Sequence, residues 1–295
     1  PEKNMNKKFT RIGNDGIIYR IFPSTYINKR FEYSLSLIRE LKRVIKNEQV
    51  LIHIHGTYYF HSYFIIRCIG RKIPIIVQNH GGLPSKLRFR KSFHPLKFLF
   101  LFVNLIERLI FKNIDKFFCM FFEEKEFLSE IYGVDRVELQ TMGVDFKKFR
   151  HIGKEYARKE LNLDKEKKIL LFIGRLVKFR GINYLLESIK EIKFFFPNVI
   201  LFIIGNGPYE KKLKNMSKSL NINNNVIFTG HISNDTLPLW YNAADIVISP
   251  TLIANFEIVP IEALACETSL VVTNVGNNPK IVKNFERGYF IPPKD

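Results

Sequence analysis

The second half of the chain repeats one pattern, in which a short, mostly apolar run is followed by a segment whose apolar residues recur at helical spacing. The apolar runs lie at 168–173, 199–204, 226–228, 246–249 and 269–273. Runs of this length without polar alternation are typical of strands buried on both faces, and strands that alternate with helices form parallel sheets. The pattern therefore predicts an α/β domain whose loops at the carboxyl ends of the strands bind a ligand.

The first half shows the same alternation less regularly. The segments 9–12 and 17–22 flank Asn14, Asp15 and Gly16, and Asp-Gly between two such segments predicts a β-hairpin. Further strands are expected at 50–55, 73–77 and 114–122, and helices at 31–45, 62–69 and 123–131. The charged stretch 151–168 is expected to be a linker with a short helix. Because ordinary domains have about 100–200 residues, we expect two domains, at 1–150 and 151–295.

Composition limits the possible partners. The 295 residues hold 46 Lys and Arg against 28 Asp and Glu, a formal net charge of +18, and 28 are Phe. This balance indicates an anionic partner: nucleic acid, a membrane surface or a phosphorylated ligand. The three cysteines, Cys68, Cys119 and Cys266, are too far apart for a zinc motif and indicate a reduced chain. The longest apolar stretch, 96–106, is shorter than the ~20 residues of a spanning helix.

Four loop patterns follow one another in the second half. The first two are Gly174-Arg175-Leu176 with Arg180-Gly181, and Gly205-x-Gly207-Pro208. The third is Ala243-Ala244-Asp245, and the fourth is Phe256-x-x-Val259-Pro260-x-Glu262-Ala263. Each pattern is weak by itself, but their order and spacing together make a chance similarity improbable.

This ordered set resembles the C-terminal domain of the family 4 glycosyltransferases, which are retaining enzymes of the GT-B type. His80-Gly81, and Met142-Gly143-Val144-Asp145 with Phe149, are similar to motifs of the family's N-terminal domain. The resemblance implies an α/β fold of the GT-B class, with two Rossmann-like domains that face a central cleft. Both domains are expected to be truncated at their outer ends, because the family's first strand and its last helices have no match here.

The resemblance implies transfer of a sugar from a UDP-, GDP- or ADP-sugar to a glycan or a lipid-linked acceptor. No cofactor is expected, and no metal, because Asp-x-Asp is absent. The leaving diphosphate gains negative charge, which arginines stabilise. The candidate catalytic residues are His80, Arg175 and Arg180. The candidate donor-binding residues are Gly174, Gly207, Phe256, Glu257, Ile258, Val259 and Glu262.

Each candidate has a purely structural alternative. Arg175 and Arg180 are otherwise solvated surface arginines, and Glu262, which the resemblance assigns to the ribose, is otherwise an acid that complements a helix dipole. His80, which the resemblance sets beside the donor sugar, is otherwise a structural residue at a strand end. The motif around each residue favours the functional alternative.

One position departs from the family pattern. Ala254 stands where the family has a glutamate that contacts donor-sugar hydroxyls, and Glu257 stands at a glycine position. Alanine has no side-chain acceptor. Three explanations are open: Glu257 contacts the sugar, the donor sugar differs, or activity has been lost. The last would make the chain a catalytically impaired homologue that binds nucleotide sugar or a partner subunit; we favour altered but real transfer.

The segment 86–111 is basic first and rich in Phe and Leu afterwards. This composition suits an interfacial helix on anionic lipid, and equally a helix that packs in the core with a solvated basic side. The protein is accordingly expected in the cytoplasm, with peripheral contact to the cytoplasmic membrane through 86–111, in polysaccharide or glycolipid biosynthesis. Nucleic acid is not expected as a partner, because the lysines are scattered and no stacking platform accompanies them.

Overall fold

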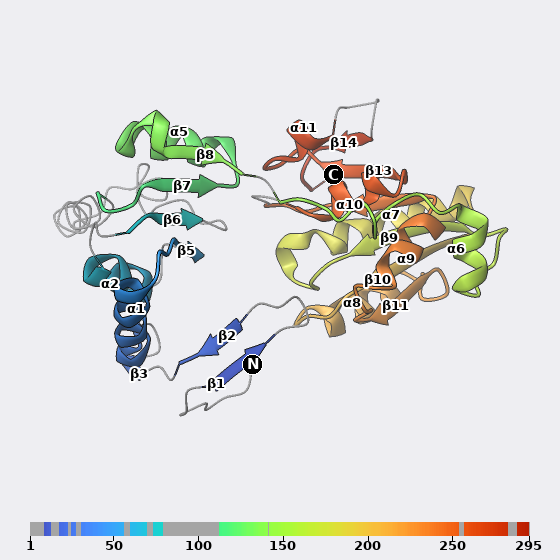
Figure 1. Cartoon of the computed structure of the whole chain (residues 1–295). Coiled ribbons are helices and arrows are strands. Elements are labelled where there is room, and N and C mark those ends of the chain that lie inside the picture. Colours follow the sequence, from blue (N-terminus) through green and yellow to red (C-terminus); the bar gives the residue numbers. More distant parts are fainter. Residues whose placement is uncertain are drawn as a thin grey trace. The chain divides into compact units, whose positions relative to one another are not determined.

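The computed structural model describes residues 9–12, 18–22, 25–27, 31–55, 60–69, 73–78, 112–140, 142–253, 257–282 and 288–294 (Figure 1). The chain divides into two compact units, Pro1–Thr141 and Met142–Asp295. Residues 142–150 therefore belong to the second unit. In the described part of the chain, no helix is long and apolar enough to cross a membrane.

A parallel sheet forms the centre of the first unit. Its strand order is β5 (Ile52–His55), β6 (Ile75–Gln78), β7 (Lys116–Cys119) and β8 (Val137–Leu139). The connecting helices are α1 (Leu35–Asn47), α2 (Phe60–Ile69) and α5 (Phe122–Tyr132), and a 3-10 turn, η2 (Val134–Arg136), precedes β8. Buried side chains such as Ile66, Ile75 and Val77 form one core with these helices.

Two hairpins precede this sheet. Strands β1 (Phe9–Ile12) and β2 (Ile18–Ile21) pair antiparallel across the Asp-Gly segment, which confirms the predicted hairpin. A second pair, β3 (Thr25–Ile27) and β4 (Phe31–Tyr33), was not predicted. The helix expected from residue 31 therefore begins only at Leu35, where the Ser34 hydroxyl accepts a hydrogen bond from Leu37 N at 3.3 Å and caps the helix.

The second unit contains a six-stranded parallel sheet. Its order is β11 (Val226–Gly230), β10 (Val199–Ile204), β9 (Lys168–Ile173), β12 (Ile246–Ser249), β13 (Ser269–Thr273) and β14 (Tyr289–Ile291). The chain moves outward from β9 to β11 and then returns to the other side of β9 to form β12. Such a reversal is the switch point at which parallel sheets bind ligands. Both units thus confirm the predicted α/β class.

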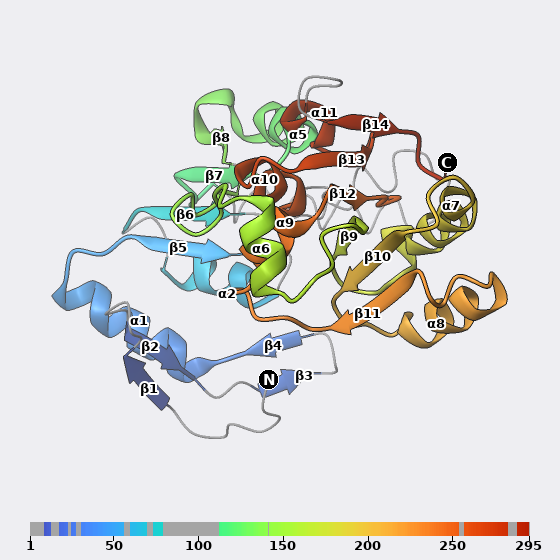
Figure 2. The same ribbon diagram turned by 90° about the vertical axis from the view of Figure 1, so that its right-hand side faces the viewer.

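Helices cover both faces of the second sheet (Figure 2). Helices α7 (Ile182–Phe195) and α8 (Glu210–Ser219) share one core with Leu170 and Phe172. The other face carries α9 (Leu237–Ala243) and α10 (Val259–Ala265), which share a second core with Ile169 and Leu171. Consecutive residues of β9 thus point to opposite cores, as strand geometry requires. The remaining elements are α6 (Lys154–Glu160), the 3-10 turn η3 (Lys178–Arg180) and α11 (Asn278–Ile281).

Candidate functional site

The loops after β9 and β10 meet at one end of the second sheet, where its parallel strands have their carboxyl ends. We call this end the carboxyl edge, and the opposite end, where the strands begin, the amino edge. Gly174 N–H donates to Ile204 O at 3.0 Å, and Leu176 N–H donates to Asn206 O at 3.0 Å. The two loops are thus held together by their own backbones. This arrangement lies beside the switch point between β9 and β12, so it occupies the position expected of a ligand site in this fold.

Glycines make the close approach of these loops possible. A Cβ at Gly205 would lie 2.0 Å from Gly174 O, and a Cβ at Gly207 would lie 2.2 Å from Leu176 O. Gly181 has φ +68°, and a Cβ there would lie 2.0 Å from Pro250 O. No side chain fits at such distances, so the glycines of the motifs are required by the packing of one loop on another.

The two arginines of the first loop are in different environments. Arg175 is exposed, and its guanidinium makes no hydrogen bond or ion pair with a described residue. The Arg180 side chain is 25% exposed, and its Nη1 donates to Thr251 Oγ1 at 3.2 Å and pairs with the Glu257 carboxylate. Its Nε is buried and has no partner among the described residues. Arg180 is therefore positioned by the protein, whereas Arg175 is free to move.

The Glu257 carboxylate is surrounded by donors. Besides Arg180, it accepts hydrogen bonds from Thr251 Oγ1 at 2.6 Å, from Ser249 Oγ at 3.1 Å and from Asn278 Nδ2 at 3.2 Å. Its side chain is 1% exposed. A buried carboxylate is stable when it is paired and hydrogen-bonded in this way. Glu257, which stands at a family glycine position, is thus a buried side chain that holds Arg180, Thr251, Ser249 and Asn278 together.

Glu262 is held by a tyrosine. The hydroxyl of Tyr241, a fully buried residue of α9, donates to Glu262 Oε2 at 2.6 Å. Burial raises the pKa of the Glu262 carboxyl above its usual value, and the hydrogen bond from Tyr241 and the charge of Lys148 offset part of that effect. Burial and the neighbouring carboxylate also raise the pKa of Tyr241. One oxygen of Glu262 is therefore fixed in place near the start of α10.

Several candidates lie outside the described residues: His80, Phe256, Ala254 and the segment 86–111. Ile258 immediately precedes α10, and Val259 begins it. In the part of the chain that is described, no cluster of three or more His, Cys, Asp or Glu side chains could hold a metal ion.

The structure brings together most of the described candidates in the loops at the carboxyl edge. Arg180 contacts Glu257, and the loop that carries both arginines rests on Gly205 and Gly207. Sequence reasoning missed the side chains that hold the two acids: Ser249, Thr251, Asn278 and Tyr241. A hydroxyl on each side of Pro250, at the end of a predicted strand, was the available signal for Ser249 and Thr251. Asn278 and Tyr241 lie in no motif.

Comparison with known proteins matches this architecture to glycosyltransferases. A sucrose-phosphate synthase of Thermosynechococcus elongatus superposes with a TM-score of 0.72 at 21% identity, over 99% of this chain and 74% of the other. The Anabaena protein HepE in complex with UDP superposes with a TM-score of 0.67 at 15% identity, over 87% of this chain and 68% of the other. These likenesses define the fold class as GT-B, with two Rossmann-like domains.

Two family models divide the chain between them. "Glycosyltransferase Family 4" matches residues 5–148, and "Glycosyl transferases group 1" matches residues 153–295. The chain belongs to the family 4 glycosyltransferases.

Relatives agree with this membership. An uncharacterised glycosyltransferase of Methanocaldococcus jannaschii is 28% identical over 73% of this chain and 53% of its own length. A D-inositol 3-phosphate glycosyltransferase of Catenulispora acidiphila is 30% identical over 59% of this chain and 43% of its own length. The chain thus spans about half the length of the curated relatives it matches.

Proposed function

We propose that the protein to which this chain belongs is a retaining glycosyltransferase, which transfers a sugar from a nucleoside diphosphate to a glycan or a lipid-linked acceptor. The observation that carries the proposal is the carboxyl edge of the second sheet, where a glycine-closed loop presents Arg175 and Arg180 beside the switch point. HepE, which shares the fold, has been solved in complex with UDP and with UDP-glucose, and this supports a nucleotide-sugar donor.

The two arginines have separate roles in this proposal. Departure of the sugar leaves negative charge on the diphosphate, and a preorganised cation lowers the barrier because it needs no reorganisation during the reaction. Arg180, fixed through Nη1 by Thr251 and Glu257, is the preorganised donor, and its Nη2 makes no hydrogen bond with a described residue. Arg175, which is exposed, closes on the diphosphate after it binds. Glu257 positions Arg180 and does not itself contact the sugar.

The remaining candidates complete the donor site. The Glu262 carboxylate, held on one oxygen by Tyr241, accepts hydrogen bonds from the ribose with the other. Gly174 and Gly207 let the loop backbone approach the nucleotide, and main-chain groups around Phe256, Ile258 and Val259 contact the diphosphate or the sugar. His80 is assigned a role at the donor sugar, as the family resemblance implies. The acceptor binds in the first unit, and the protein works in the cytoplasm, with 86–111 resting on the membrane.

A direct test measures nucleotide binding and donor turnover separately. Calorimetry of the full-length protein with UDP, GDP and ADP identifies the base, and release of free sugar from the matching donor measures turnover. We expect Arg175→Ala and Glu262→Ala each to weaken nucleotide binding at least tenfold, because a hydrogen bond to a charged group contributes about 1.5–3 kcal/mol. Arg39→Ala, an exposed arginine of α1, serves as the matched control. Unchanged affinity and turnover in both variants would refute the assignment.

The Arg180–Glu257 pair favours a second candidate, a non-catalytic subunit that binds nucleotide sugar. A cation already paired with a carboxylate stabilises less of the charge that develops on a leaving group. The two candidates differ in one outcome: a subunit binds the nucleotide but releases no sugar at any donor concentration. If activity appears only in the double variant Ala254→Glu, Glu257→Gly, the chain is a lapsed enzyme.

A further inference from the structure

Helix α7 ends with Phe194 and Phe195, Phe196 follows as its C-cap, and all three side chains face solvent. Phe194 is 83% exposed, Phe195 is 72% exposed and Phe196 is 53% exposed. The buried side of the helix is formed earlier, by Ile182, Leu185, Leu186 and Ile189. A run of exposed aromatic side chains has no role in the core, and such apolar patches on soluble domains mark interaction sites.

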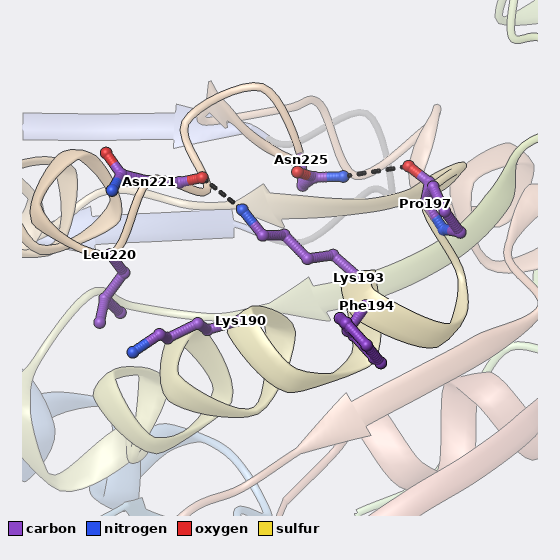
Figure 3. Close-up of a pocket in the computed structure, with 7 residues that line it drawn as sticks. All are labelled: Lys190, Lys193, Phe194, Pro197, Leu220, Asn221 and Asn225. Atoms are coloured by element: carbon purple, nitrogen blue, oxygen red, sulfur yellow. Dashed lines mark hydrogen bonds between the residues drawn. The ribbon is translucent and has the colours of Figure 1, made fainter.

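Two lysines of α7 lie beside this aromatic run. Lys190 and Lys193 lie on the last turns of α7, and together with Phe194 and Pro197 they line an open groove of about 600 Å³ (Figure 3). Lys193 Nζ reaches across the groove and donates to Asn221 O at 2.6 Å, whereas Lys190 is exposed.

A second basic segment is fastened next to the aromatic run. The stretch 165–168, which leads into β9, reads Lys-Glu-Lys-Lys, and Asn198 joins it to the end of α7. Asn198 Nδ2 donates to Glu166 O at 2.8 Å, and Lys168 N–H donates to Asn198 O at 3.3 Å. The stretches 165–168 and 190–196 together hold five lysines and two glutamates. We call these two stretches the basic aromatic edge.

We propose that the basic aromatic edge docks on an anionic lipid bilayer, with Phe194 and Phe195 inserted at the interface and the lysines on the headgroups. Apolar insertion and attraction between lysines and anionic headgroups add to one another, which is the usual basis of peripheral binding. The chain's net charge of +18 acts in the same direction. This proposal does not depend on the glycosyl transfer proposed above, and it concerns a surface other than 86–111.

The geometry favours a bilayer over a protein partner. Phe194 and Phe195 lie edge to face with their ring centroids 5.3 Å apart, so they form one short aromatic projection. A helix that binds a protein groove instead presents a longer stripe of apolar residues spaced three and four positions apart. A fluid interface accepts side chains in any direction. A second copy of the chain is disfavoured, because the lysines of the two copies would face one another.

Docking at this edge leaves the loops after β9 and β10 accessible. We call these loops, which carry Arg175, Arg180, Gly205 and Gly207, the donor loops. The basic aromatic edge lies at the amino ends of β9 and β10, whereas the donor loops lie at their carboxyl ends. Six residues of strand span about 20 Å. The bilayer and the donor loops therefore lie on opposite ends of the same sheet, and a soluble nucleotide sugar enters from the side away from the lipid.

A site-specific fluorophore tests the proposal apart from any other membrane-binding segment. The chain has one tryptophan, Trp240, so Phe195→Trp in a Trp240→Phe background reports on position 195 alone. With vesicles of phosphatidylcholine containing 30% phosphatidylglycerol, we expect a blue-shifted emission that brominated lipid quenches. Pure phosphatidylcholine should give a much smaller shift. Phe146→Trp in the same background, at a side chain that is 70% exposed, should not shift.

Sedimentation with the same vesicles measures binding of the whole chain. We expect Phe194→Ser with Phe195→Ser to weaken the apparent affinity of the chain for anionic vesicles at least fivefold, whether or not 86–111 also binds lipid. Lys165→Glu with Lys190→Glu should reduce the preference for anionic over neutral lipid. The matched control, Phe146→Ser with Tyr156→Ser, should bind as the parent does, and circular dichroism verifies that each variant is folded. An unshifted emission at position 195 with anionic vesicles overturns the proposal. So does dimerisation without lipid that the phenylalanine substitutions abolish, which would assign the edge to a second copy.

Discussion

Each end of the strands in the second sheet has a partly buried ion pair between an arginine and a carboxylate. The two arginines differ in how their donor nitrogens are used. At the amino edge, Arg158 donates through Nε to Ala243 O at 3.0 Å, through Nη1 to Lys165 O at 2.7 Å and through Nη2 to Asp245 at 2.8 Å. At the carboxyl edge, Arg180 bonds Thr251 and Glu257 through Nη1, while its Nε has no partner among the described residues.

This difference separates a pair that holds the fold from a pair that retains capacity for a ligand. Each of the three nitrogens of Arg158 donates to a partner within the fold, and the side chain is only 7% exposed. The Nη2 group of Arg180 makes no hydrogen bond with a described residue, and it lies at the end of the sheet where parallel sheets bind ligands. The connecting segments are also held together differently at the two ends. At the amino edge, the side chains of Asn198 and Asn225 donate hydrogen bonds to neighbouring backbone, whereas at the carboxyl edge glycines let the loop backbones pack directly on one another.

The largest effect on stability is expected at the amino edge. Arg158→Ala removes three hydrogen bonds from a side chain that is 7% exposed and leaves Asp245 with Lys154 as its remaining charged partner. Breaking a buried pair in this way costs about 3–5 kcal/mol. Urea unfolding followed by Trp240 fluorescence reports on the second unit, because Trp240 packs on Phe202 in its core. A loss below about 1 kcal/mol would show that this pair is not structural.

A smaller loss is expected when a glycine of the carboxyl edge gains a side chain. Gly207→Ala sets a Cβ 2.2 Å from Leu176 O, so the two loops must separate. Overpacking of this kind costs about 1–3 kcal/mol. Gly143→Ala is the control, because a Cβ there meets nothing within 4 Å and the residue has no positive φ. Equal midpoints of urea unfolding for the two variants would contradict the loop packing described here.

These two edges also show what the sequence can and cannot predict. Local apolar runs predicted β9, β10, β12 and β13, and the motif glycines predicted where loops come close, because both signals lie within a few neighbouring residues. The Arg180–Glu257 pair joins residues that are 77 positions apart, and it depends on β9 and β12 becoming neighbours through a reversal of strand order. Strands β3, β4, β8 and β14 were missed because three residues carry too little periodicity.

Arg158→Ala should have the larger effect on stability, and Arg180→Ala should have the larger effect on nucleotide binding. Arg180→Ala leaves Glu257 with three other donors, so we expect a stability loss of about 1–2 kcal/mol, smaller than that of Arg158→Ala. Its affinity for the nucleoside diphosphate should fall at least tenfold, whereas folded Arg158→Ala should bind within twofold of the parent. Calorimetry at a temperature at which both variants are folded checks this, and equal affinities would show that Arg180 is also only structural.

The smallest effect concerns two carboxylates whose pKa values shift in opposite directions. Burial raises the pKa of Asp245, but hydrogen bonds from Lys154 and Ile169 N–H, with the charges of Lys154 and Arg158, hold it below the usual value. The pKa of Glu262 is raised by burial. A lowered pKa contributes stability that is present above the unfolded pKa of about 3.9 and is lost as pH falls through the folded value. A raised pKa contributes stability that is present below about 4.3 and is lost as pH rises through the folded value.

The two neutral variants should therefore change the pH dependence of stability with opposite signs. Relative to the parent, Glu262→Gln should gain stability as the pH rises from 4 to 8, by about 1 kcal/mol or less, because the parent pays for ionising a buried acid over that range. Asp245→Asn should be less stable than the parent by the largest amount at pH 7, and this difference in the free energy of unfolding should become smaller as the pH falls below 4. Urea unfolding at several pH values measures both slopes. If both variants changed the slope in the same direction, the opposite pKa shifts of Asp245 and Glu262 would be contradicted.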